Sequence, residues 1–455
     1  MKNEIRIASG QGYWGDLPIA PFKQVTEGDI DYLVMDYLAE VTMSIMQKQK
    51  NKNPELGYAR DLPEVLRDIL PTCKEKNIKV ITNGGGVNPH ACALETLRHA
   101  KELGIEGLKI AVVYGDNIVD ELDYLVSDDC KLNNMETGES IEIIRDKILS
   151  ANVYLGAFPI VEALQKGADV VITGRTTDTG LTLAPMIYEF GWAKDNFDLM
   201  AVGTVAGHIL ECGAQASGGN LLADWESVED MANIGFPIAI AKPNGEIIIT
   251  KHESMGGKVS FETIAEQLVY EIGDPAEYIT PDCVVDFTSI KLEDLGNNHV
   301  RVYDVKGKPD TEFYKVSCSY EDGWSAEGGL TYSWPKALTK AKAADKIIRK
   351  RFEMLGLNFE EIRTEYIGYD SCHGPLSKQL DEDDINEIRL HIAVRSHDKN
   401  SIVRFGREIV PLVLTGPPSV TGFAGGRARP SDVVAYWPAL IPKKLITPQV
   451  EIMEL

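Results

Sequence analysis

Short apolar segments, each followed by a Gly-, Asn- or Thr-rich loop and then a helical pattern, recur through the first 285 residues. Runs at 5–8, 32–35, 79–82 and 110–113 predict buried strands, because they are bounded by turn-forming residues. Strands that alternate with helices favour parallel pairing with crossover helices. We therefore expect residues 1–285 to form an α/β domain built on an open, mostly parallel sheet.

The stretch from residue 151 to residue 180 gives this pattern in its most regular form. Residues 153–155 and 169–172 are predicted strands, and residues 160–165 between them are a predicted helix. This order predicts two parallel strands that are joined by a crossover.

The pattern changes after residue 285. Residues 335–355 form an amphipathic pattern that Gly356 closes, and a second helix is predicted at 401–414. Strands are predicted at 313–320, 329–332, 361–367, 387–394 and 433–437. The order β-α-β-β-α-β resembles a ferredoxin-like unit, so residues 286–455 are expected to form a smaller α+β domain.

Composition narrows the function classes. The chain of 455 residues carries 46 basic and 69 acidic side chains, for a net charge of −23. Such a chain is not expected to bind nucleic acid or anionic membranes. No apolar run approaches the length of about 20 residues that a membrane span needs. Seven scattered cysteines without a CxxC pair and an N-terminus without a signal-like segment favour the cytoplasm.

Three glycine-rich loops follow predicted strands, at 10–16, 83–89 and 174–180. Open parallel sheets bind ligands at the carboxyl ends of their strands, so we expect these loops to share one pocket for a small anion. The alternative is that the glycines only form tight turns and that Arg175 pairs with an acid. The predicted ligand-binding residues are Gly10, Gly12, Asp16, Asn83, Gly84, Gly85, Arg175, Thr176 and Asp178.

The first loop also matches the dinucleotide-binding pattern G-x-G-x-x-G, and Asp36 follows at a suitable distance. However, Pro18 and Pro21 come where the helix should open, and only a short segment precedes the next strand. NAD binding is therefore not expected, although a nicotinamide-dependent oxidoreductase is kept as an alternative.

A second cluster is His208, Glu211 and Cys212, which helical spacing places on adjacent faces of one turn. Histidine and glutamate can transfer protons, and a cysteine beside a histidine can act as a nucleophile. The alternative is a helix end that contains a buried, inert cysteine. The run from Asp370 to His373 contains metal-ligand types, but no second ligand pair has zinc-like spacing, so no metal site is predicted.

A polar loop at 415–427 is rich in turn-forming residues. Arg427 and Arg429 at its end are expected to bind an anionic ligand or acids of a neighbouring subunit, or to form ordinary surface pairs.

Segments along nearly the whole chain resemble the acyclic terpene utilisation (AtuA) family: 5–16, 31–40, 82–89, 207–215, 270–276 and 413–427. The resemblance implies catabolism of branched isoprenoid acids as CoA thioesters, without established catalytic residues to transfer. Longer members resemble this chain with an added ferredoxin-like domain, so a separately encoded small partner of that fold is expected.

We therefore predict an enzyme of lyase or hydratase type that acts on a branched carboxylate or its acyl-CoA thioester. Glu211, Cys212 and His208 are its candidate catalytic residues. A homo-oligomer is expected. The third hypothesis is a non-catalytic subunit that works with the small partner.

Overall fold

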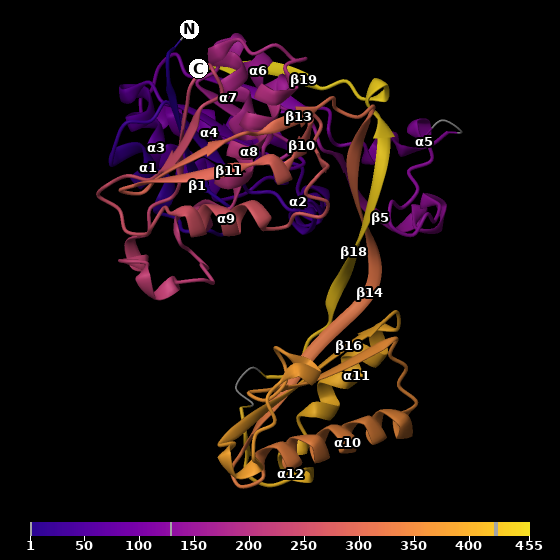
Figure 1. The fold of residues 1–455 in the computed structure, drawn as a ribbon. Coiled ribbons are helices and arrows are strands. Elements are labelled where there is room, and N and C mark those ends of the chain that lie inside the picture. The colour runs from indigo at the N-terminus through magenta and orange to yellow at the C-terminus, as the bar shows by residue number, and fades with distance from the viewer. Residues whose placement is uncertain (1, 128–129, 423–425) are drawn as a thin grey trace. The chain divides into compact units, whose positions relative to one another are not determined.

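The computed structural model describes residues 2–127, 130–422 and 426–455. By contacts the chain forms two compact units, Met1–Ser319 with Tyr436–Leu455, and Tyr320–Ala435. The chain passes from one unit to the other within β14 (Phe313–Ser333) and β18 (Ser431–Pro442) (Figure 1). The domain boundary predicted at residue 285 stays a prediction.

The first unit is built on a ten-stranded sheet. Its centre is five parallel strands, and antiparallel strands extend it on both sides. The strand order is β11 (Lys291–Gly296), β12 (His299–Tyr303), β8 (Ile247–Thr250), β7 (Ile238–Ala241), β1 (Ile5–Gln11), β2 (Tyr32–Met35), β3 (Lys79–Thr82), β6 (Val170–Thr173), β4 (Lys109–Tyr114) and β19 (Gln449–Glu454).

The sheet is therefore mixed, and the expectation of a mostly parallel sheet is wrong outside its centre. The sequence signals did predict the central strands, since 32–35 and 79–82 are strands with these bounds. All four residues of β2 and of β6 are buried, as expected of strands that helices cover on both faces. The antiparallel additions join the centre through strands that are distant in sequence, since β7 pairs with β1 and β19 pairs with β4, whereas β7–β8 and β11–β12 pair strands that are close in sequence.

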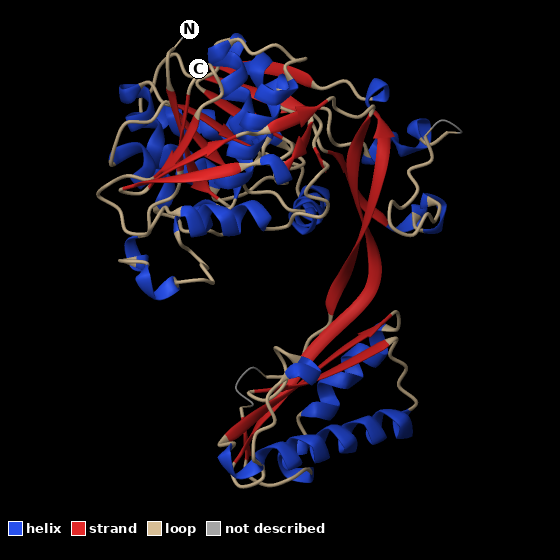
Figure 2. Cartoon of the chain, in the orientation of Figure 1, coloured by secondary structure: helices blue, strands red, loops and turns tan. Residues whose placement is uncertain are grey.

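Helices surround this sheet (Figure 2). One apolar cluster joins α3 (Leu62–Lys76) and α4 (Pro89–Glu102) to the central strands. On α7 (Gly180–Phe190) and α8 (Phe197–Glu211) most residues are buried. The other helices of this unit are α1 (Ala20–Thr26), α2 (Glu40–Lys52), α5 (Leu122–Leu125), α6 (Phe158–Gln165) and α9 (Phe261–Val269).

The crossover predicted around residue 160 is wrong in its first strand. β5 (Ile148–Val153) pairs with β14 and is not part of the ten-stranded sheet. Both edges of β6 are already hydrogen-bonded, to β3 on one side and to β4 on the other, so no edge is left for β5. A separate three-stranded sheet contains β13 (Lys306–Lys308), β10 (Val284–Asp286) and β9 (Tyr278–Ile279).

The second unit contains an antiparallel sheet in the order β15 (Glu361–Ile367), β16 (Glu387–Ser396), β14 and β17 (Val420–Thr421). Alternate residues of β14 and β16 pack with α10 (Ala337–Leu355), α11 (Lys399–Ile409) and α12 (Leu412–Thr415) in one core. Helix α10 ends at Gly356, whose φ of +62° is the left-handed conformation that glycine adopts readily. The chain is thus an α/β protein with an additional antiparallel sheet, and the ferredoxin-like interpretation stays a prediction.

Among the described residues, no helix combines the length and the apolar character that crossing a bilayer requires.

Candidate functional site

The carboxyl ends of the parallel strands lie at one edge of the sheet, and the loops that follow them contact one another. The amide of Asp36, after β2, donates to the carbonyl oxygen of Gln11 at the end of β1 (3.0 Å). The side-chain oxygen of Asn83, after β3, accepts from the amide of Tyr37 (2.8 Å). The loops after β1, β2 and β3 thus lie together, although they are distant in sequence.

The glycines of these loops lie against protein atoms. A Cβ at Gly12 would lie 2.8 Å from the carbonyl carbon of Cys212, and one at Gly85 would lie 2.6 Å from the carbonyl oxygen of Thr173. A Cβ at Gly10 or Gly84 would meet leucine side chains at 2.9 and 2.6 Å. Gly12 and Gly85 need glycine because backbone atoms of other segments approach them closely, whereas Gly10 and Gly84 face leucine side chains. This close packing is a structural role other than the tight turns considered as the alternative, and direct contact of these glycines with a ligand stays a prediction.

The dinucleotide-like loop has the same constraint. The space beside Gly12 is taken by the end of α8, where a pyrophosphate would have to approach. Asp16 accepts from the amide of Gly12 (2.9 Å) and from the amide of Leu17 (2.7 Å), so this carboxylate is used inside its own loop. A short helix, α1, does fit between β1 and β2, contrary to the expectation that the segment is too short.

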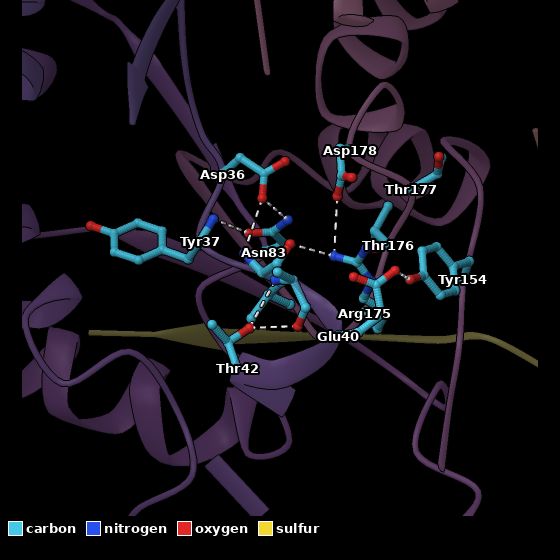
Figure 3. Close-up of polar contacts among 12 residues, drawn as sticks. Asp36, Tyr37, Glu40, Thr42, Asn83, Tyr154, Arg175, Thr176, Thr177 and Asp178 are labelled. Carbon is cyan, nitrogen blue, oxygen red and sulfur yellow. Dashed lines mark hydrogen bonds and ion pairs between the residues drawn. The ribbon is translucent and has the colours of Figure 1, made fainter. Parts of the chain in front are cut away.

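Two aspartates form the centre of the site (Figure 3). Asp36 is 6% exposed and accepts from the side-chain amide of Asn83 (2.7 Å) and from the amide of Leu38 (3.0 Å). Burial, followed by the charge of Asp178, raises the pKa of the Asp36 carboxyl well above its ordinary value, although Arg175 opposes the shift. Burial also raises the pKa of Asp178, against Arg175 and a hydrogen bond with Asp36. The two carboxyl groups therefore titrate as a coupled pair that retains a proton more readily than a free aspartate.

Arg175 holds this pair from inside the protein. Its side chain is only 3% exposed, whereas that of Asp178 is 33% exposed. The Nη1 atom donates to the carbonyl oxygen of Leu38 (2.7 Å) and to Oδ1 of Asp178 (3.1 Å), and the Nε atom is buried without a partner. The guanidinium stacks on the ring of Tyr154 at 4.2 Å, and the hydroxyl of Tyr154 donates to Glu40 (2.6 Å) (Figure 3). Arg175 therefore pairs with an acid, Asp178, which is the alternative that the sequence left open for this arginine.

The backbone of the Arg175 loop is fixed by a buried acid that the sequence analysis missed. Oδ2 of Asp116, after β4, accepts from the amide of Arg175 (2.8 Å) and from the side-chain amide of Asn152 (2.9 Å). Burial raises the pKa of Asp116 to about 6. Thr176 next to Arg175 is fully buried and donates to the hydroxyl of Thr173 (3.1 Å). The role of Asp116 had no signal in the sequence, because an Asp after a strand is common in turns.

His208 and Glu211 form an ion pair in the last turn of α8. Nδ1 of His208 lies 2.8 Å from Oε1 of Glu211, and Nε2 lies 2.9 Å from the carbonyl oxygen of Gln267. Burial lowers the pKa of His208, but Glu211 outweighs it, so the pKa is raised overall. Burial raises the pKa of Glu211 against the effect of His208, and the charge of Asp178 adds to this increase. Glu211 is thus electrostatically coupled to both His208 and Asp178.

Cys212 follows the last residue of α8 and is partly buried. Burial, with a contribution from Glu211, raises the pKa of its thiol to about 12. The thiol form therefore predominates near neutral pH, which disfavours a thiolate nucleophile at this position.

Residues far along the chain complete the surroundings of His208. Gln267 of α9 also donates to the carbonyl oxygen of His208 (2.8 Å), and the rings of Tyr278 and Phe287 lie 5.8 and 5.4 Å from the imidazole. The segment that contains Tyr278 follows a motif noted for its family resemblance, but nothing in its spacing pointed to this contact.

The remaining predicted residues lie in the second unit. Arg427 and Arg429 line a cavity in it, and residues 423–425 of the same loop lie outside the described residues. Cys372, in the run 370–373, is exposed. Among the described residues, no group of three or more His, Cys, Asp and Glu side chains is arranged to hold a metal ion.

These features define an α/β protein with a cluster of coupled titratable side chains at the carboxyl ends of its parallel strands. The chain matches the model of the family described as acyclic terpene utilisation family protein AtuA over residues 5–452. It belongs to this family, as its motifs indicated, and membership implies a role in acyclic terpene utilisation. No curated protein and no solved structure matches the chain in the other two comparisons.

Proposed function

We propose that this protein is an enzyme that transfers protons on a branched carboxylate or its acyl-CoA thioester, in a lyase- or hydratase-type reaction. The observation that carries the proposal is the cluster of Asp36, Asp178 and Glu211, three carboxyl groups whose pKa values are all raised. Raised pKa values bring carboxyl groups closer to neutral pH, where proton transfer in both directions is efficient. Family membership supports the substrate class.

Asp178 is the proposed base. It is the more accessible member of the aspartate pair, and Arg175 fixes its carboxylate from the protein side. Asp36 is buried and adjusts the pKa of Asp178 through their coupling. In a dehydration, the carboxylate of Asp178 would take the proton from the carbon next to the substrate carbonyl.

Glu211 is the proposed acid. Its side chain is 13% exposed, Oε1 faces His208, and Oε2 is buried without a hydrogen-bond partner in the structure. A buried oxygen without a partner is unfavourable, and a substrate hydroxyl would satisfy it. In the same dehydration, protonated Glu211 would donate its proton to the departing hydroxyl, which leaves as water while the carbon–carbon double bond forms.

Proton exchange provides a test that does not require the natural substrate to be known. The protein is incubated in D2O with a panel of branched 3-hydroxy acids, the corresponding unsaturated acids and the CoA thioesters of both. NMR then follows deuterium incorporation and hydration. At least one member should react, and Asp178→Asn and Glu211→Gln should each slow it by about 100-fold or more.

The matched controls are Asp195→Asn and Glu226→Gln, which make the same chemical changes at exposed positions. They should leave the rate unchanged. The proposal is overturned if no panel member reacts with folded protein, or if both site variants keep the full rate. Cytoplasmic location, a homo-oligomer and a small partner protein stay predictions.

A further inference from the structure

The second compact unit contains a cavity of about 840 Å³. It is lined by residues of β14, β16 and α11 and by the described part of the segment that leads into β18. All of these residues belong to one compact unit, so the cavity is independent of the site described above. Its volume is in the range of pockets that enclose small organic ligands.

Three arginines line this cavity: Arg389 on β16, and Arg427 and Arg429 before β18. All three are exposed, and none of their guanidinium groups forms an ion pair or a hydrogen bond with another described residue. The lining acid, Glu327, lies instead 3.3 Å from Nε2 of His391. In a chain with 69 acidic and 46 basic side chains, three arginines without acid partners around one cavity form an unneutralised positive site.

The backbone holds two of these arginines against helix α11. A Cβ at Gly406 would lie 2.2 Å from the carbonyl oxygen of Ala428, the residue between Arg427 and Arg429. Glycine at position 406 therefore allows the segment to lie directly on the helix. This close contact fixes the start of both arginine side chains at the rim of the cavity.

The rest of the lining is small or apolar. Ile409 and Val410 of α11 and Ala393 of β16 contribute apolar surface, and Gly328 and Gly329 of β14 contribute no side chain. A ligand that fits has several anionic oxygens at one end and an apolar part at the other. Guanidinium groups bind phosphate oxygens in pairs, and three of them exceed what a single carboxylate uses.

We propose that this cavity is a binding site for a soluble organic phosphate, with the phosphate on Arg389, Arg427 and Arg429 and the apolar part against Ile409 and Val410. The concave shape favours a small molecule over an acidic protein surface, and the net charge of −23 disfavours nucleic acid. The proposal does not depend on the reaction proposed for the first unit.

Calorimetric titration of the full chain tests the site with three probes: hexyl phosphate, inorganic phosphate and 1-hexanol. Hexyl phosphate should bind more tightly than either of the others. Arg389→Gln, Arg427→Gln and Arg429→Gln should each weaken it by about tenfold. Ala393→Leu, which fills the cavity and leaves the charges, should weaken hexyl phosphate more than inorganic phosphate.

The matched control is Arg407→Gln. Arg407 is exposed on α11 next to Gly406 but does not line the cavity. Unchanged affinity in this variant, with an unchanged thermal midpoint in all five, supports a specific site. Equal weakening by all four arginine variants would show only general charge attraction and would overturn the proposal. So would the absence of hexyl phosphate binding.

Discussion

Nδ1 of His208 lies 2.8 Å from Oε1 of Glu211, one helical turn along α8. The other ring nitrogen lies 2.9 Å from a backbone carbonyl oxygen, so both nitrogens face acceptors. A ring between two acceptors is best satisfied when it carries both protons. The pair thus places a histidine with a raised pKa beside a carboxyl group whose other oxygen has no hydrogen-bond partner, and it is the most specific element of the proposed acid–base site.

The first prediction concerns the protonation of His208. Its ring signals, assigned by comparison with His208→Gln, should titrate in NMR spectra with a pKa above the ordinary 6.5. In Glu211→Gln the pKa should fall, because burial then acts without the opposing charge. A pKa that is unchanged in Glu211→Gln would contradict the ion pair.

The same shift has a consequence for stability. Because the folded-state pKa of His208 is raised, the stability that the pair contributes is fully present below pH 6.5 and is lost as the pH rises through the folded-state pKa. The free energy of unfolding, measured with urea, should therefore decrease above pH 6.5 in the wild type. The decrease should be smaller in Glu211→Gln.

A second prediction concerns Asp116. Its pKa is raised from 3.8 to about 6, which corresponds to about 3 kcal/mol of unfolding free energy. The folded state binds this proton more tightly, so the contribution is present below pH 3.8 and is lost as the pH rises through about 6. In Asp116→Asn, whose amide oxygen can still accept from Arg175 and Asn152, this loss should disappear. The measurement is urea unfolding between pH 4 and pH 7.

The control is Asp195→Asn at an exposed position, which should keep the wild-type pH dependence. Parallel stability curves for the wild type and Asp116→Asn would show that Asp116 is ionised at no cost in the folded protein.

A third prediction concerns Arg175. Arg175→Gln removes a buried guanidinium that pairs with Asp178 and stacks on Tyr154, so it should destabilise the protein by about 3 kcal/mol. Asp178→Asn should recover part of this loss in the double variant, because the aspartate pair then carries less charge. Arg67→Gln, which breaks the exposed pair with Asp68, should cost less than about 1 kcal/mol in the same unfolding assay. An equal cost for the two arginine variants would argue against a buried role of Arg175.

A fourth prediction concerns Gly12. Gly12→Ala places a methyl group 2.8 Å from the backbone at Cys212, so the end of α8 must move. The expected cost is about 1–3 kcal/mol, together with a change in the titration of His208. Gly273→Ala, where no atom lies within 4 Å of the new Cβ, should change neither. If Gly12→Ala behaves like Gly273→Ala, the first loop does not pack as described.

The sequence by itself determined the central parallel strands and the helix between residues 337 and 355. These elements depend on local patterns: buried apolar runs bounded by turn-forming residues, and an apolar stripe closed by Gly356. It also determined where the candidate site lies, because parallel strands necessarily place their carboxyl ends, and the loops after them, on one edge. The family motifs lay in these same loops.

Tertiary structure alone decided which groups act together. The pairing of β5 with β14 depends on which strand edges other strands leave free. The same is true of the antiparallel strands that extend the sheet. The coupling of Asp36 to Asp178, and the position of Asp116 under Arg175, join residues separated by 59 or more positions, for which spacing gives no signal. Burial of Arg175 and of the thiol of Cys212 changed their expected roles, because desolvation is a property of the packed environment and not of the residue type.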